Sequence, residues 1–270
     1  MPMINVNGIR LYHTDSGGEK PAVVFSHGLL FGSGVWANQV EFFKDNYRVI
    51  TYDHRGQGQS EVSASGYDMD SVTADAAALI RALGVEGCHF VGLSMGGFVA
   101  LRLALNYPEL VSTISVLDSS AEPEPPENHG KYKFLNFMQK WFGKKIVMGS
   151  VMPIMFGQTF LNDPARHDEV KYWRRFLETT GGRKGASRAV MGVIERTGVS
   201  DRIAGIKTPT LIAVGAEDIA TVPEKSERMH AAIPGSEFVL IPKAGHQSNV
   251  DAPDAVNAAL SDFLARHSKS

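Results

Sequence analysis

The chain of 270 residues contains a single cysteine, Cys88. One cysteine cannot form a disulfide within the chain or build a cysteine-based metal site. The sequence also lacks an H-x-x-x-H pair, a phosphate-binding P-loop and a G-x-G-x-x-G turn, which are common patterns for metal and nucleotide binding. We therefore expect a protein that needs no cofactor and no metal, with Cys88 as a small apolar core residue.

Neither a charge excess nor a long apolar run is present. The 27 Lys and Arg residues nearly balance 29 Asp and Glu, a formal net charge of −2, which gives no overall reason to expect nucleic acid or an anionic membrane as partner. No window reaches the roughly 18 apolar residues of a membrane-spanning helix. Residues 1–5 lack the basic and then apolar pattern of a signal peptide, so we expect a cytoplasmic protein that acts on a small molecule. A monomer and a homodimer both stay open.

Short apolar runs alternate with helical patterns along much of the chain. An Asn-Gly dipeptide within Ile4–His13 predicts an opening antiparallel hairpin, and six β-prone runs follow: Ala22–Ser26, Tyr47–Tyr52, Cys88–Val91, Ser112–Leu117, Pro209–Gly215 and Phe238–Ile241. Helical patterns lie between or after them at Val35–Lys44, Asp70–Leu83, Met95 onward, Pro223–Ala232 and Pro253–Arg266. This alternation predicts an α/β fold with a mostly parallel, doubly wound sheet of eight strands.

The alternation of strand and helix patterns stops in the middle of the chain. Residues 121–200 contain no buried strand pattern, and they open with the exposed segment Glu122–Pro126 before amphipathic segments at Phe134–Phe142 and Val170–Thr179. We interpret residues 121–200 as a helical cap inserted after the sixth strand. Residues 1–120 and 201–270 then form the α/β core.

The pentapeptide Gly92-Leu93-Ser94-Met95-Gly96 lies between a strand pattern and a helix pattern. A G-x-S-x-G sequence in that context is typical of a nucleophile elbow, a strained turn that presents the serine hydroxyl. The glycines are needed because a side chain at Gly92 or Gly96 would prevent close packing of the helix on the strand. Ser94 is therefore the candidate nucleophile.

Two further polar residues follow the last two predicted strands. Asp218 and His246 come after Ser94 in the order Ser, Asp, His. A serine hydroxyl becomes a useful nucleophile when an imidazole takes its proton and a carboxylate fixes that imidazole. We assign these roles to Ser94, His246 and Asp218. Asp118, one strand earlier, is an alternative source of the carboxylate.

The chain resembles the α/β-hydrolase fold family over nearly its whole length. The resemblance rests on His27-Gly28, on Gly92-x-Ser94-x-Gly96-Gly97, on the cap, on Gly215-x-x-Asp218 and on Gly245-His246. It is most similar to the 3-oxoadipate enol-lactonase group and neighbouring esterases, although enol-lactonases often have Asn-Ser where this chain has His27-Gly28. The resemblance implies an oxyanion hole made by the backbone N–H groups of Met95 and Leu29, with Leu30 as the alternative to Leu29.

The cap contributes large apolar side chains that suit an acyl or ring group of modest size. As substrate-binding candidates we single out five residues: Leu30, Trp141, Phe142, Met155 and Trp173. Most aromatic residues of the cap are expected only to pack it on the core. The cap also has 13 Lys and Arg residues against 8 Asp and Glu, which could favour an anionic substrate such as a carboxylated lactone or could reflect solvated helix faces.

The resulting hypothesis is a serine hydrolase that cleaves a carboxylic ester or lactone through an acyl-enzyme on Ser94. A haloperoxidase-like perhydrolase and a C–C bond hydrolase would use the same three residues. An alternative of a different class is a ligand receptor or binding module that has kept the fold.

Overall fold

Eight strands form one sheet in the computed structural model, which describes residues 3–268. They are β1 Met3–Val6, β2 Ile9–Asp15, β3 Ala22–Ser26, β4 Arg48–Tyr52, β5 Cys88–Leu93, β6 Val111–Leu117, β7 Thr210–Gly215 and β8 Glu237–Ile241. Their order across the sheet is β1-β2-β4-β3-β5-β6-β7-β8. The pairs β1–β2 and β2–β4 are antiparallel, and every other neighbouring pair is parallel. The eight-stranded, mostly parallel sheet is confirmed.

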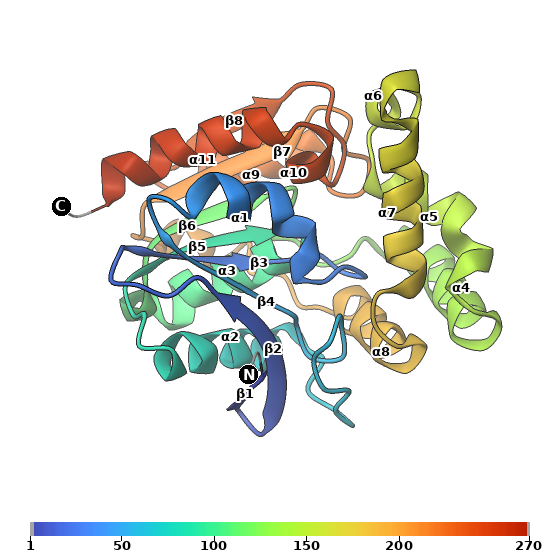
Figure 1. Cartoon of the computed structure of the whole chain (residues 1–270), viewed down its shortest axis with the longest axis horizontal. Helices are drawn as coiled ribbons and strands as arrows, with labels where there is room; N and C mark the ends of the chain where they lie inside the picture. The colour runs from blue at the N-terminus through green and yellow to red at the C-terminus, as the bar shows by residue number, and fades with distance from the viewer. Residues whose placement is uncertain (1–2, 269–270) are drawn as a thin grey trace.

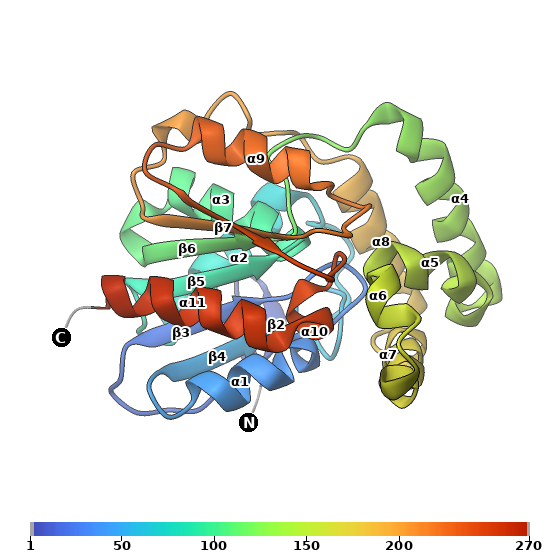
Figure 2. The same ribbon diagram turned by 90° about the horizontal axis from the view of Figure 1, so that it is seen from above.

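Helices cover both faces of this sheet (Figures 1 and 2). One face carries α2 Met69–Ala82, α3 Met95–Asn106 and α9 Pro223–Ala232, and the other carries α1 Ala37–Phe43 and α11 Pro253–His267. Successive side chains of β3 point to opposite faces of the sheet. Val24 packs in the apolar core beneath α2, α3 and α9, and Val23 and Phe25 pack in the core beneath α1 and α11. A strand buried in this way has no solvent-facing position, which explains why it reads as a continuous apolar run.

The helix boundaries follow ordinary capping chemistry. The Asp68 side chain accepts a hydrogen bond from the Ser71 N–H at 2.8 Å and so caps α2. Gly84, just after that helix, has a φ of +63°, the left-handed conformation in which glycine commonly ends a helix. Pro223 and Pro253 occupy the first helical position of α9 and α11, where no backbone N–H is required.

Five α-helices and two 3₁₀ turns lie within residues 121–200, between β6 and β7 (Figure 2). They are α4 Pro126–Phe142, η3 Lys144–Val147, α5 Met148–Met155, α6 Gln158–Leu161, η4 Pro164–Arg166, α7 His167–Thr179 and α8 Arg183–Ile194. We call α4 to α8 the cap helices, and both views place them together at one end of the sheet. The sequence predicts only part of α4 and α7 and does not reveal α5, α6 or α8.

The remaining short elements are η1 Ser33–Trp36, η2 Pro108–Leu110, η5 Ile203–Gly205 and α10 Ser248–Asp251. Across residues 3–268, no helix combines the length and apolar character that crossing a bilayer would require.

Candidate active site

The turn between β5 and α3 holds Ser94 in a strained conformation. Its φ of +53° and ψ of −112° lie outside the regions that L-residues ordinarily adopt. The turn is packed so tightly that a Cβ at Gly92 would overlap the carbonyl oxygen of Gly96, and a Cβ at Gly96 would overlap that of Ser26. Glycine at both positions therefore allows the backbone to lift the Ser94 side chain away from the strand.

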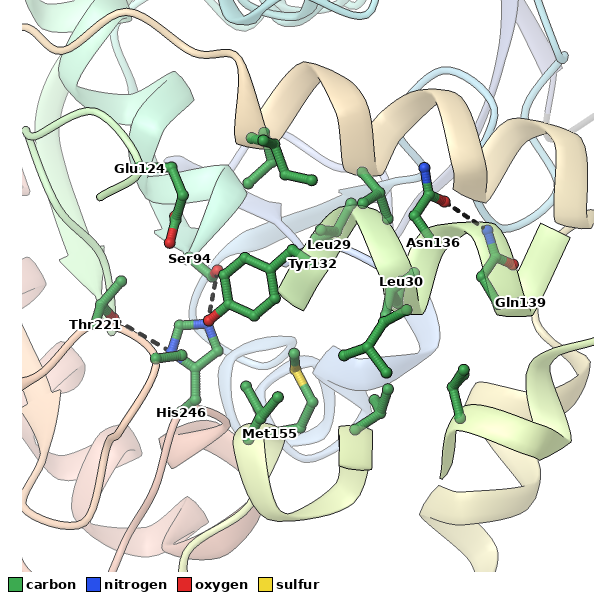
Figure 3. Close-up of a pocket in the computed structure, with 18 of the residues that line it drawn as sticks. Leu29, Leu30, Ser94, Glu124, Tyr132, Asn136, Gln139, Met155, Thr221 and His246 are labelled. Atoms are coloured by element: carbon green, nitrogen blue, oxygen red, sulfur yellow. Dashed lines mark hydrogen bonds between the residues drawn. The ribbon is translucent and has the colours of Figure 1, made fainter. Parts of the chain in front are cut away.

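Ser94, His246 and Asp218 form a continuous hydrogen-bonded trio. His246 Nε2 lies 2.8 Å from Ser94 Oγ, and His246 Nδ1 lies 2.9 Å from Asp218 Oδ2. Figure 3 shows the Ser94–His246 contact beside the cavity. All three residues are buried, so solvent competes little with these contacts. The imidazole can accept the hydroxyl proton on one nitrogen while its other nitrogen donates to the carboxylate.

The loop after β7 fixes the Asp218 carboxylate from several directions. The N–H groups of Ala220 and Thr221 donate to Oδ1 at 2.8 and 3.0 Å, and the Thr221 hydroxyl donates to Oδ2 at 2.8 Å. Thr221 Oγ1 also lies 3.2 Å from His246 Nδ1, and Figure 3 shows this second contact. Thr221 is a site residue that the sequence reasoning missed. The available signal was its place three residues after an aspartate in a loop, where hydroxyls commonly bind carboxylates.

The electrostatics around His246 favour its protonated form. Burial by itself lowers the pKa of the imidazole, but the charge and hydrogen bond of Asp218, with smaller contributions from Asp118 and Glu124, raise it, and the net pKa lies above the usual 6.5. A protonated imidazole at this position is thus stabilised by the surrounding carboxylates.

Asp118, the alternative carboxylate, accepts hydrogen bonds from donors other than His246. Its Oδ1 accepts a hydrogen bond from the Gly215 N–H at 2.8 Å, and its Oδ2 accepts one from the Ser248 hydroxyl. It makes no hydrogen bond with His246 within residues 3–268. Burial, reinforced by the nearby Asp218, raises the pKa of Asp118 to about 8. Asp118 therefore braces the loops that carry the site, and the carboxylate in contact with the imidazole is that of Asp218.

Two backbone N–H groups flank Ser94 without a protein acceptor in the described chain. The Met95 N–H belongs to the first turn of α3, where no intrahelical acceptor exists, and the Leu29 N–H lies in the loop after β3. The Leu30 N–H is already engaged, since it donates to Gln57 Oε1 at 2.8 Å. Of the two candidates in the loop after β3, the Leu29 N–H is therefore the one available to a bound group, together with the Met95 N–H.

A cavity of about 120 Å³ opens beside Ser94 and His246. Leu29, Leu30 and Phe98 line it from the core, and the cap helices contribute Leu135, Val151, Ile154, Met155, Val190 and Val193. Two of the five residues predicted to bind substrate, Leu30 and Met155, thus reach the cavity (Figure 3).

The other three predicted substrate-binding residues lie elsewhere. Trp141 and Phe142 are each 63% exposed on the outer surface of the last turn of α4. Trp173 is buried, but it packs against Phe31 and Phe156 in the core behind the cavity. These three predicted side chains therefore do not line the cavity beside Ser94, because an aromatic residue in a helix reaches a cavity only if the helix turns that face inward.

A polar cluster marks the cavity wall near Ser94. Arg196 Nη1 donates to Glu124 Oε2 at 2.9 Å, and both side chains are nearly inaccessible to solvent. Tyr132 projects toward Ser94 and His246 in Figure 3, and burial together with the charge of Glu124 raises the pKa of its hydroxyl to about 12. The sequence reasoning did not single out any of these three residues. Tyr132 thus stays protonated and can donate a hydrogen bond into the cavity.

Comparison with known proteins identifies the class. The family model of the α/β hydrolase fold matches residues 21–253, and the chain belongs to that family and is a hydrolase. Among its relatives, 3-oxoadipate enol-lactonase 1 of Acinetobacter baylyi is 30% identical over 256 residues, covering 90% of this chain and 88% of that protein. A relative from Agrobacterium fabrum whose name proposes carbamate hydrolysis is 25% identical, covering 93% of this chain and 96% of its own.

A solved structure is similar over the whole chain as well. The enol-lactonase from Burkholderia xenovorans superposes with a TM-score of 0.90 at 26% identity, and the match covers 98% of this chain and all of that one. The resemblance inferred from the sequence motifs is therefore confirmed at the level of the family and its enol-lactonase members.

Proposed function

We propose that the chain is a cofactor-independent serine hydrolase of carboxylic esters or lactones, which works through an acyl-enzyme on Ser94. The observation that carries the proposal is the hydrogen-bonded trio of Ser94, His246 and Asp218 placed against a cavity, with two unpaired N–H groups beside the hydroxyl. Each half of an acyl transfer needs a nucleophile, a base and an oxyanion site, and the trio with these N–H groups supplies all three.

In the first half-reaction, Ser94 Oγ attacks the carbonyl carbon of the substrate while His246 Nε2 takes the hydroxyl proton. The charge that develops on the carbonyl oxygen is stabilised by the N–H groups of Leu29 and Met95, each donor contributing about 3 kcal/mol to transition-state stabilisation. His246 then gives its proton to the leaving alkoxide as the acyl–oxygen bond breaks. Asp218 keeps the proton on Nδ1, so that Nε2 is the nitrogen that exchanges protons.

In the second half-reaction, His246 takes a proton from water, which attacks the acyl carbon. Collapse of the tetrahedral intermediate returns the proton to Ser94 Oγ and releases a carboxylic acid. A lactone would give one product, a hydroxy acid, because the alkoxide that leaves the substrate's carbonyl carbon in the first step stays tethered to the acyl group until water releases it from Ser94.

The cavity supports a small, uncharged acyl group. Its wall is mostly apolar, and among residues 3–268 the one Lys or Arg side chain that lines it, Arg196, is already paired with Glu124. The positive charge of the cap is therefore not presented to the substrate as a free cation. We expect an uncharged ester or lactone to be hydrolysed faster than a carboxylated lactone, even though enol-lactonases are among the relatives.

The decisive experiment compares the chain with Ser94→Ala. Hydrolysis of 4-nitrophenyl acetate and of an uncharged lactone should fall to background in the variant, while its circular dichroism and thermal transition stay unchanged. A fluorophosphonate probe should label the parent chain at Ser94 and leave the variant unlabelled. Ester turnover that survives in a folded Ser94→Ala variant would rule out the proposed mechanism.

The same assays separate the alternatives. Bromination of a phenol dye with acetate and peroxide that exceeds ester hydrolysis would favour a perhydrolase, and cleavage of a carbon–carbon bond next to a ketone would favour a C–C hydrolase. A carbamate in the panel tests the activity named for the Agrobacterium fabrum relative. A single burst of product without turnover across the panel would favour a ligand receptor.

A further inference from the structure

The outer face of α4 and η3 carries a stripe of large apolar side chains. Its members are between 53% and 63% exposed: Phe134, Phe137, Trp141, Phe142 and Ile146. Steps of three and four residues place Phe134, Phe137 and Trp141 on one side of the helix. We call these five residues the aromatic stripe. A solvent-facing side of a helix is normally polar, so a contiguous apolar surface of this kind indicates a binding partner.

The aromatic stripe does not line the cavity beside Ser94, because a different face of α4 points inward. Tyr132, Leu135, Asn136 and Gln139 of the same helix line the cavity beside Ser94. The inward face thus carries several polar residues and the outward face carries the aromatic ones. Packing within the described chain gives no reason for the stripe.

Basic residues without carboxylate partners surround the stripe. Residues 128–147 contain five lysines and no aspartate or glutamate, and α8, which packs against α4, adds three cations and no acid. Seven of these eight side chains are exposed or half-buried: Lys131, Lys133, Lys140, Lys145, Arg183, Lys184 and Arg188. No ion pair in residues 3–268 involves any of the seven.

We propose that the aromatic stripe and these seven cations form a surface that binds an anionic lipid bilayer, with α4 lying in the plane of the headgroups. Aromatic side chains favour the boundary between headgroups and acyl chains, and nearby lysines and arginines are attracted to anionic headgroups. The adjacent residues Lys140 and Trp141 combine a cation with an aromatic ring, since Lys140 Nζ lies 5.5 Å from the centre of the Trp141 ring. Such a helix lies on a membrane and does not span it.

Charge and shape favour a bilayer over a second copy of the chain. A two-fold symmetric contact through this face would bring the two sets of unpaired cations together, which repels. The stripe lies on α4 and η3, and α4 is at the outer edge of the molecule in both views (Figures 1 and 2). A soft, negatively charged surface can cover such an edge without a shaped partner.

Trp141 gives a direct readout of this binding. The chain has three tryptophans, of which Trp36 and Trp173 are buried and Trp141 is 63% exposed. Vesicles of equimolar phosphatidylcholine and phosphatidylglycerol should shift the tryptophan emission to the blue and should sediment with the protein. Phosphatidylcholine vesicles alone should do neither, and salt should weaken the binding because it screens the headgroup attraction.

Two variants test the two parts of the surface. Phe137→Ser should weaken vesicle binding by about tenfold through loss of an inserted ring. Lys140→Glu should weaken it by at least about fivefold, the factor that corresponds to one basic residue near an anionic surface. Phe42→Ser, at an exposed phenylalanine of α1 (49%), is the matched control and should bind normally. All three variants should keep the parent's ester hydrolysis in solution, which shows that they are folded.

The proposal is overturned if the anionic vesicles neither shift the emission nor sediment the protein. A concentration-dependent dimer that dissociates in Phe137→Ser, without vesicle binding, would assign the stripe to a second copy. Equal, salt-independent binding to neutral vesicles would also overturn it, because the cations would then have no part. Binding that Phe42→Ser weakens as much as Phe137→Ser does would place the lipid contact elsewhere on the molecule.

Discussion

Replacing Asp218 with Asn tests the proposed base most sharply, because the structure dictates how the new amide must turn. The N–H groups of Ala220 and Thr221 both donate to Oδ1, so the amide oxygen has to occupy that position. The amide nitrogen then takes the place of Oδ2, 2.9 Å from His246 Nδ1. An NH₂ group there donates to Nδ1 and leaves the ring proton on Nε2.

That tautomer cannot serve as the base. Nε2 lies 2.8 Å from Ser94 Oγ and has to be unprotonated to accept the hydroxyl proton. The variant also loses the negative charge that stabilises the imidazolium. In the template triad the same substitution costs about 10⁴ in kcat, which corresponds to about 5.5 kcal/mol in the activation free energy. We expect a loss of that order here, with KM changed little because Asp218 does not line the cavity.

The assay compares kcat/KM for an uncharged ester in the parent, in Asp218→Asn and in Asp118→Asn at pH 7. Burial raises the pKa of Asp118, so an uncharged amide is tolerated better at this position than at Asp218. Its hydrogen bonds run to Gly215 and Ser248 rather than to His246. We expect a loss below about tenfold for Asp118→Asn. If this variant were the crippled one and Asp218→Asn were active, the assignment of the carboxylate would be refuted.

The remaining predictions concern pH and backbone packing. Because the raised pKa of His246 keeps it protonated to higher pH, kcat/KM for a non-ionising ester should rise through a single ionisation centred above about 6.5, and a midpoint below that value would contradict the role of the surrounding carboxylates. Glu124→Gln removes one of those charges, so the midpoint of the same profile should move to lower pH. An unchanged midpoint would show that Glu124 does not affect the pKa of His246. Gly92→Ala forces a Cβ onto the Gly96 carbonyl and should lower Tm by more than about 5 °C in a thermal melt, whereas Gly205→Ala, where a Cβ meets nothing within 4 Å, should leave Tm nearly unchanged.

Much of the core fold could be predicted because buried parallel strands leave a strong local signal. Ala22–Ser26 is the same segment in the prediction and in β3, and the α9 range of Pro223–Ala232 also agrees. In both cases the signal is local: a continuous apolar run in the strand and a proline at the first position of the helix. The proximity of Ser94, Asp218 and His246 could be predicted because each residue follows a strand whose carboxyl end lies at the same edge of the sheet.

The cap could be predicted only in outline. Its helix α5 is eight residues long and contains Pro153, and α6 has four residues, so neither is long enough for a clear helical period. The sequence of a cap helix also does not show which of its faces points toward the cavity. In α4 the inward residue Gln139 is polar and the outward residue Trp141 is aromatic, which reverses the usual pattern and misdirects an assignment based on hydrophobicity.

The balance of charges at His246 depends on distances that a linear sequence does not contain. Burial under an apolar wall lowers the pKa of an imidazole and neighbouring carboxylates raise it, so residue types alone leave the sign open. In the folded chain Asp118 and Asp218 follow the neighbouring strands β6 and β7, and both contribute to raising the pKa of His246. Only the loop after β7, through three hydrogen-bond donors, turns its carboxylate onto the ring. The proposed role of His246 as general base therefore depends on the fold of residues 216–221 as much as on the presence of an aspartate.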